Sequence, residues 1–172
     1  MGQGLGTIFG LITAFAITFV VMTFGTYMPA DLISPTVVQD FLSNSDLEIR
    51  IAVVGTILYP SALGGSSLGS VVGYGATGAS VLMFLAWGAA GLIAGLMSKD
   101  FLPAILAAVF AAIIGALLTW LLIFVISPDF DIAAIFAPGS LLLMEVALEG
   151  AIYPCIACII GAILGGGITR DR

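Results

Sequence analysis

Residues 74–126 set the architecture of this chain, and they read YGATGASVLMFLAWGAAGLIAGLMSKDFLPAILAAVFAAIIGALLTWLLIFVI. The charged residues in this stretch are Lys99 and Asp100, which separate two apolar runs. A helix needs about 20 apolar residues to cross about 30 Å of hydrocarbon, and each run is longer than that. The stretch therefore predicts two transmembrane helices, Tyr74–Ser98 and Phe101–Ile126, joined by a tight turn at one membrane face.

Charge is scarce along the whole chain. Of the 172 residues, 61% are hydrophobic and 8% are charged, whereas a soluble domain is nearer half apolar and a quarter charged. Residues 1–30, 51–98 and 101–128 contain no Asp, Glu, Lys or Arg. Lipid is therefore the expected solvent for much of the surface. We predict an all-α polytopic membrane protein, with two further spans at Leu5–Met28 and Leu141–Ile168.

The polar residues narrow the classes of function. The net charge is −6, and the four basic residues, Arg50, Lys99, Arg170 and Arg172, do not form the patch that binds nucleic acid or polyphosphate. The sequence contains no histidine, so histidine-ligated zinc or haem and histidine acid–base catalysis are excluded. We expect no enzyme, no cofactor and no metal, and a lipid-modifying activity is disfavoured. The expected partners are membrane lipid and other membrane helices, not nucleic acid.

The connection after the first span contains two features. Ser34 followed by Pro35 is typical of a helix N-terminus, so we expect a short surface helix over residues 34–42. Residues 51–73 carry no charge and are interrupted by Pro60. This segment either dips into the membrane as a re-entrant segment, which gives four spans, or crosses it as a fifth span.

Internal similarity favours four spans. Placing the first span over the third at an offset of 101 pairs Thr18 with Thr119, and placing the second over the fourth at an offset of 71 pairs Gly95 with Gly166. Two units that run in the same direction each need an even number of crossings. We therefore predict four transmembrane helices in two tandem helix-loop-helix repeats.

The repeat units are expected at residues 5–100 and 101–172, within a single integral membrane domain of residues 1–172. A competing pattern is the echo of Tyr59-Pro60 in Tyr153-Pro154, which indicates inverted repeats with paired broken helices. This alternative stays open at the level of sequence.

Positive charge predicts the orientation. Cytoplasmic loops carry an excess of Lys and Arg, and Lys99, Arg170 and Arg172 share one side in the four-span arrangement. We expect a multi-pass plasma-membrane protein with both termini in the cytoplasm and its acidic connections outside.

A candidate ion or solute site combines two glutamates with two proline breaks. Glu145 and Glu149 lie four residues apart and share a helix face with Tyr153. Carboxylates within hydrocarbon tend to mark ion pathways, and a proline in a helix frees a backbone carbonyl. Anchoring of the glutamates at the interface and simple helix kinks are the competing interpretations. The candidate residues are Glu145, Glu149, Tyr153, Pro154, Tyr59 and Pro60.

Small residues recur at four-residue spacing, which is typical of close helix packing in membranes. They predict packing within the chain, with docking of another subunit as the alternative. The residues concerned are Gly91, Gly95, Gly115, Gly161 and Gly165.

Hydroxyls and thiols within the spans have simple structural interpretations. Thr18 and Thr119 are expected to hydrogen-bond to the carbonyl four residues earlier in their helices. Cys155 and Cys158 are expected to pack as small apolar side chains.

The sequence leaves two function hypotheses open. The first is a non-catalytic integral membrane subunit of a larger complex for transport or for ion or electron translocation. The alternative is a small homo-oligomeric transporter or channel for a cation or a small solute.

Overall fold

The protein is helical throughout the part of the chain that the structure covers. The structure is a computed structural model that describes residues 2–60, 69, 72–126 and 150–169. These residues form no strand, which confirms the all-α prediction for them. Their helices are α1 (Gly2–Thr23), the 3-10 helix η1 (Gly25–Tyr27), α2 (Pro35–Ser43), α3 (Leu47–Leu58), α5 (Val81–Ser98), α6 (Phe101–Ile126) and α9 (Gly150–Thr169).

Four helices are long and apolar enough to cross a membrane. They are α1, α5, α6 and α9, and their mean hydropathies are 2.2, 1.9, 2.8 and 2.0. These four helices indicate a multi-pass membrane protein. The third predicted span coincides with α6, and the part of the fourth before Gly150 lies outside the described residues.

The other span boundaries differ from the sequence prediction for local reasons. The second span was predicted to begin at Tyr74, which is wrong, because α5 begins at Val81. The Ser80 hydroxyl accepts a hydrogen bond from the Met83 N–H at 3.2 Å and caps the helix there. The first span ends at Thr23, five residues before the predicted Met28, and the chain then turns through η1.

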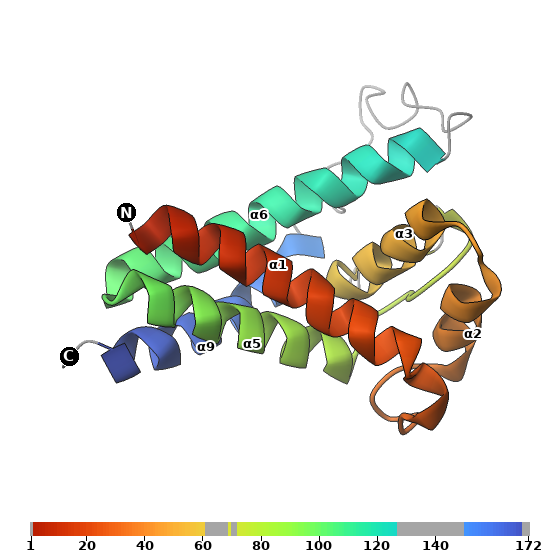
Figure 1. Ribbon diagram of the computed structural model, residues 1–172, viewed down its shortest axis with the longest axis horizontal. Helices are drawn as coiled ribbons and strands as arrows, with labels where there is room; N and C mark the ends of the chain where they lie inside the picture. Colours follow the sequence, from red (N-terminus) through yellow and green to blue (C-terminus); the bar gives the residue numbers. More distant parts are fainter. Residues whose placement is uncertain (1, 61–68, 70–71, 127–149, 170–172) are drawn as a thin grey trace.

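Both described chain ends lie at one end of the bundle (Figure 1). Gly2 lies against Ser98 at the end of α5, and Gly166 near the end of α9 lies against Asp100. We call this the terminal end. We call the opposite end, where α1 stops and α3 starts, the α2–α3 end.

Small residues let α1 pack closely against two helices near the terminal end. Gly6 lies beside Ala107 of α6, and Gly10 lies beside Ala111, so α1 and α6 run in parallel. Gly10 also faces Ala94 of α5, and α5 runs antiparallel to α1. Without Cβ atoms at these glycines the helix axes approach closely, which is the usual basis of helix association in lipid.

The seam between α5 and α9 is closer still, and it is made of backbone. A Cβ atom at Gly91 would overlap the Cys158 carbonyl, and one at Gly95 would overlap the Ala162 carbonyl. From the other side, Cβ atoms at Gly161 and Gly165 would overlap carbonyls of α5. The order of these contacts shows that α5 and α9 run in parallel.

Toward the α2–α3 end, α1 and α6 diverge and α3 lies between them (Figure 1). Every residue from Ala52 to Leu58 is buried. The 12 residues of α3 extend about 18 Å at 1.5 Å per residue, which is too short to cross the hydrocarbon. Much of the remaining 51–73 segment lies outside the described residues.

The predicted surface helix is confirmed as α2, with Ser34 at its N-cap and Pro35 at its first position. Its apolar face covers the ends of α1 and η1. Phe41 is fully buried and meets the Phe19 ring edge-on, with centroids 5.3 Å apart. Val38 fills the space beside Gly25.

The α5–α9 seam yields a matched pair of variants. Gly91→Ala places a methyl group on the Cys158 carbonyl and should destabilise the bundle by about 1–3 kcal/mol through overpacking. Gly88→Ala is the control, because its Cβ meets nothing within 4 Å and alanine favours helix. Thermal unfolding in detergent measures both. Equal melting temperatures for the two variants would contradict the close backbone contact between α5 and α9.

Candidate functional site

The sequence candidates Tyr59 and Pro60 lie buried at the inner end of α3. The Tyr59 hydroxyl donates a hydrogen bond to the Ala112 carbonyl of α6 at 2.9 Å. Ala112 lies about 17 Å along α6 from Phe101 at 1.5 Å per residue, close to the middle of that helix. The helix α3 therefore starts at the α2–α3 end and stops about halfway through the bundle.

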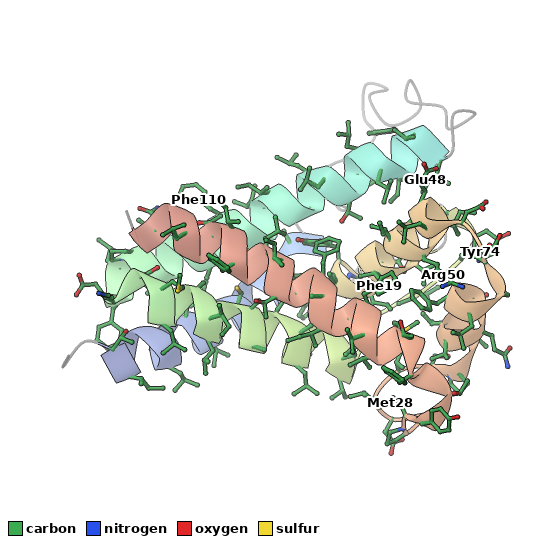
Figure 2. All side chains as sticks on the ribbon, viewed as in Figure 1. Phe19, Met28, Glu48, Arg50, Tyr74 and Phe110 are labelled. Carbon is green, nitrogen blue, oxygen red and sulfur yellow. The ribbon has the colours of Figure 1, made fainter. Side chains whose placement is uncertain are left out.

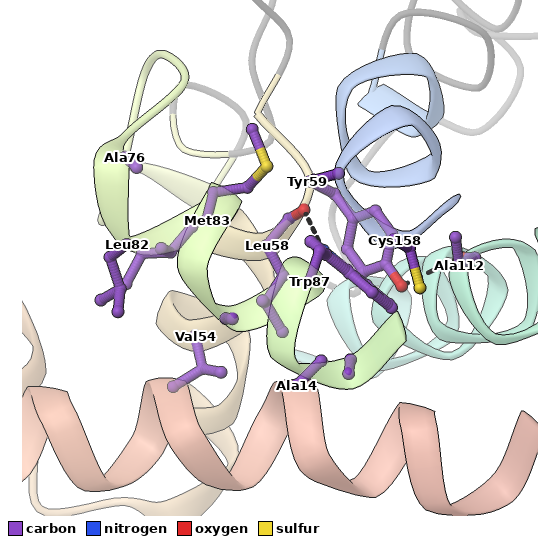
Figure 3. Close-up of a cluster of buried hydrophobic side chains, with 14 of the residues drawn as sticks. Ala14, Val54, Leu58, Tyr59, Ala76, Leu82, Met83, Trp87, Ala112 and Cys158 are labelled. Atoms are coloured by element: carbon purple, nitrogen blue, oxygen red, sulfur yellow. Dashed lines mark hydrogen bonds between the residues drawn. The ribbon is translucent and has the colours of Figure 1, made fainter. Parts of the chain in front are cut away.

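A tryptophan of α5 holds the same end of α3. The Trp87 Nε1–H donates to the Leu58 carbonyl at 2.9 Å, and the Tyr59 and Trp87 rings pack edge-on with centroids 5.5 Å apart. Figure 3 shows both hydrogen bonds side by side, with Cys158 of α9 next to the tyrosine ring. The end of a helix has carbonyls without helical partners, and Trp87 satisfies one of them where water is scarce.

The second Tyr-Pro pair lies on α9. Pro154 is buried, and the half-buried Tyr153 meets Phe84 of α5 with ring centroids 6.4 Å apart. The start of α9 approaches the end of α3, because a Cβ atom at Gly150 would lie 3.7 Å from the Tyr59 carbonyl oxygen. The structure thus brings Tyr59 close to the start of the helix that carries Tyr153. Glu145 and Glu149 lie outside the described residues.

Polar contacts near the α2–α3 end attach the loop before α5 to α2 and α3. The Asp40 carboxylate accepts a hydrogen bond from the Gly75 N–H at 3.1 Å. The buried Thr56 hydroxyl accepts one from the Ala76 N–H at 3.0 Å and donates to the Val53 carbonyl at 2.8 Å. These contacts hold the loop before α5 in place beside α2 and α3.

An apolar groove opens between α1, α3 and α6, and we call it the α1–α3–α6 groove. It consists of two adjoining cavities of about 260 and 450 Å³ that share Ile12, Phe15 and Ile51. Residues of α6 also line the smaller cavity, and Val54 of α3 also lines the larger one. Because large side chains of α1 and α6 keep these helices apart here, α3 fills only the inner part of the gap.

One buried hydroxyl in the groove lacks a partner. Thr119 of α6 is 2% exposed and lines the smaller cavity, and its Oγ1 makes no hydrogen bond to any described residue. The predicted bond to the carbonyl four residues earlier is therefore wrong for Thr119. The same prediction is confirmed for Thr18, whose hydroxyl donates to the Ala14 carbonyl at 2.9 Å. Gly55 of α3 packs directly on the Thr119 side chain. This contact distinguishes the surroundings of Thr119 from those of Thr18.

Sequence reasoning missed two residues at these sites. Trp87 was treated as part of an apolar span, although a buried indole N–H usually needs an acceptor. Arg50 was used only in counting charge. Its Nε–H donates to the Asn44 carbonyl at 2.6 Å, and its guanidinium lies 5.4 Å from the centre of the Phe41 ring. The spacing of Leu47, Arg50, Ile51 and Val54, one stripe of a helix, was the available signal.

Cys155 and Cys158 are free thiols on α9. Cys158 is fully buried within the apolar cluster, and Cys155 is partly buried beside it.

Comparison with protein-family models, with curated proteins and with solved structures found no match to this chain.

The anchor at the end of α3 predicts a specific loss of stability. Tyr59→Phe removes the hydrogen bond to Ala112 while keeping the ring, and it should lower the free energy of unfolding by about 1 kcal/mol. Tyr27→Phe is the control, because Tyr27 is 87% exposed and should be neutral. Thermal unfolding in detergent distinguishes them. An unchanged melting temperature for Tyr59→Phe would show that the bond contributes nothing.

Thr18 and Thr119 should respond differently to the same substitution. Thr119→Val keeps the shape and removes an unsatisfied buried hydroxyl, so it should stabilise the isolated chain by about 1 kcal/mol. Thr18→Val removes a bonded hydroxyl and should be neutral or slightly destabilising. Unfolding of both variants in one detergent provides the comparison. Destabilisation by Thr119→Val would mean that its hydroxyl has a partner after all.

Proposed function

We propose that this protein is a non-catalytic integral membrane subunit of a larger membrane complex, active in transport or in ion or electron translocation. We place it in the plasma membrane with both termini in the cytoplasm. Lys99 lies at the terminal end together with Gly2 and the end of α9, and Arg170 and Arg172 follow α9 in the sequence, against the single Arg50 near the other end. This excess of basic residues supports the orientation.

The observation that carries the proposal is the close contact of α5 with α1 and α9. Backbone and small side chains form these contacts, and large apolar side chains such as Trp87 and Met83 fill the described core beside them. The buried Ser and Thr residues of the described bundle are Thr7, Thr18, Thr56, Ser98 and Thr119. The described charged side chains lie at its two ends. A tightly packed wall of this kind is suited to support a pathway formed with neighbouring chains.

The direction of the helices supports the tandem-repeat proposal. The pair α1 and α6 and the pair α5 and α9 each run in parallel, and Gly10 lies beside Ala111, at an offset of 101 in the sequence. Two same-direction units related by an axis along the membrane normal would place equivalent helices next to each other in this way.

A small homo-oligomeric transporter or channel is the second candidate, and α3 favours it. Transporters bind substrates near the middle of the bilayer, where broken helices end. Helix α3 ends at Tyr59 near that level and beside the start of α9. Tyr59 and Pro60 of the candidate site lie at this end, Tyr153 and Pro154 lie in the first turns of α9, and Glu145 and Glu149 precede α9 in the sequence.

Purification in a mild detergent tests the first function. A tagged full-length chain should co-purify with other membrane proteins at fixed stoichiometry, and the assembly should dissociate in a harsher detergent. Mass spectrometry of the intact assembly measures the composition. A chain recovered alone, or only with copies of itself, would contradict the subunit proposal.

Flux measurements then separate the second function from the first. A homo-oligomer in liposomes that passes a cation or a small solute, and loses most of this flux in Glu149→Gln, would establish the transporter. Asp100→Asn at the terminal end is a charge-matched control and should leave the flux unchanged.

A further inference from the structure

One face of α3 combines a cation with the wall of the α1–α3–α6 groove. Leu47, Arg50, Ile51 and Val54 follow the spacing of a single helical stripe. Ile51 and Val54 line the larger cavity, and Arg50 lies one turn nearer the α2–α3 end. Arg50 lines neither cavity, and it follows the groove-lining residues of this stripe toward the α2–α3 end.

Contacts with α2 hold Arg50 in this position. Its Nε–H donates to the Asn44 carbonyl, and its guanidinium lies over the Phe41 ring. Phe41 in turn packs against Phe19, which lines the larger cavity. Figure 2 shows Arg50 and Phe19 near each other at the α2–α3 end. The terminal guanidinium nitrogens make no hydrogen bond to a described residue, so their donors are available to an acceptor outside the described part of the chain.

Arg50 is the basic side chain of the described α2–α3 end, where it lies among acidic side chains with which it forms no salt bridge. Within the described chain the other basic side chain is Lys99, at the terminal end. The described acidic side chains of the α2–α3 end are Asp31, Asp40, Asp46 and Glu48, and none of them forms a salt bridge with Arg50 in the structure. Guanidinium groups bind phosphate through paired, charge-assisted hydrogen bonds.

The shape of the groove suits an acyl chain. Its two apolar cavities adjoin at Ile12, Phe15 and Ile51. A flexible hydrocarbon chain can pass from one cavity into the other beside these side chains, whereas a helix is a straight and stiff rod about 10 Å across.

We propose that the α1–α3–α6 groove is a binding site for an anionic phospholipid. Its phosphate binds the Arg50 guanidinium, and one acyl chain lies against Ile51, Phe15 and Ile12. The inference is independent of the proposed function, because it rests on Arg50 and the groove alone and holds for a subunit and for a transporter.

The test compares phosphatidylglycerol with phosphatidylcholine, both with oleoyl chains, by native mass spectrometry of the delipidated full-length protein in detergent. Both phospholipids offer a phosphate to Arg50, but phosphatidylglycerol has a net negative charge and phosphatidylcholine has none, so the natural chain should bind phosphatidylglycerol more tightly. Arg50→Gln should weaken the binding of phosphatidylglycerol about tenfold, which is what a hydrogen bond to a charged group contributes, and should remove the preference. Arg50→Lys should retain part of it. Lys99→Gln is the charge-matched control and should leave the preference unchanged.

A second pair of variants tests the groove without changing charge. Ala16 is exposed and lines the larger cavity, so Ala16→Trp should weaken the binding of both phospholipids about tenfold by filling the acyl-chain site. Ile8→Trp on an exposed part of α1 outside the groove is the matched control and should bind like the natural chain. Helix content by circular dichroism confirms that each variant is folded.

Three results would overturn the proposal. The first is a preference for phosphatidylglycerol that survives Arg50→Gln in a folded protein. The second is unchanged lipid binding by Ala16→Trp. The third is a photoreactive residue at position 16 that captures a protein helix instead of a phospholipid in native membranes, because the groove would then be a subunit contact.

Discussion

A helix that stops inside a membrane leaves carbonyl groups without partners, and the fold of this protein is organised around that difficulty. Unsatisfied backbone groups in hydrocarbon cost several kcal/mol each. At the inner end of α3, the Trp87 indole supplies a donor to the Leu58 carbonyl, and Tyr59 binds across to α6. Without these bonds, the end of this 12-residue helix would leave polar groups unsatisfied in the interior of the bundle.

The distance between neighbouring helices varies along the bundle. Around Gly10 and Gly91 the chain lacks side chains, and main-chain atoms of neighbouring helices come into contact. Around Phe15 and Leu118 the side chains are large, so α1 and α6 separate and make room for α3. The sequence of small residues followed by large ones along α1 and α6 thus produces both the solid seam and the groove.

The parts of this fold that follow from composition could be predicted from the sequence. Long uncharged runs gave four apolar helices, and the Ser34-Pro35 signal gave α2. The start of α5 was misplaced because Tyr74 and the residues after it are apolar enough to continue a span, while a hydrogen bond to Ser80 selects the later start.

The candidate site was harder to predict, because its important contacts join residues far apart in the chain. Hydropathy does not indicate that Trp87 would meet Leu58, or that Gly55 would press on Thr119 and leave its hydroxyl without a partner. The helical stripe that contains Arg50 was visible in the sequence. The contact of the guanidinium with Phe41 could not be predicted, because it depends on where α2 lies relative to α3.

The groove between α1, α3 and α6 opens sideways, and this determines the route by which a molecule reaches it. A compound arriving from water would first have to partition into the bilayer and then diffuse in two dimensions to the protein. Its concentration at the groove is therefore set by its oil–water distribution and by the composition of the surrounding leaflet. Selection at this site begins in the membrane, before any contact with the polypeptide.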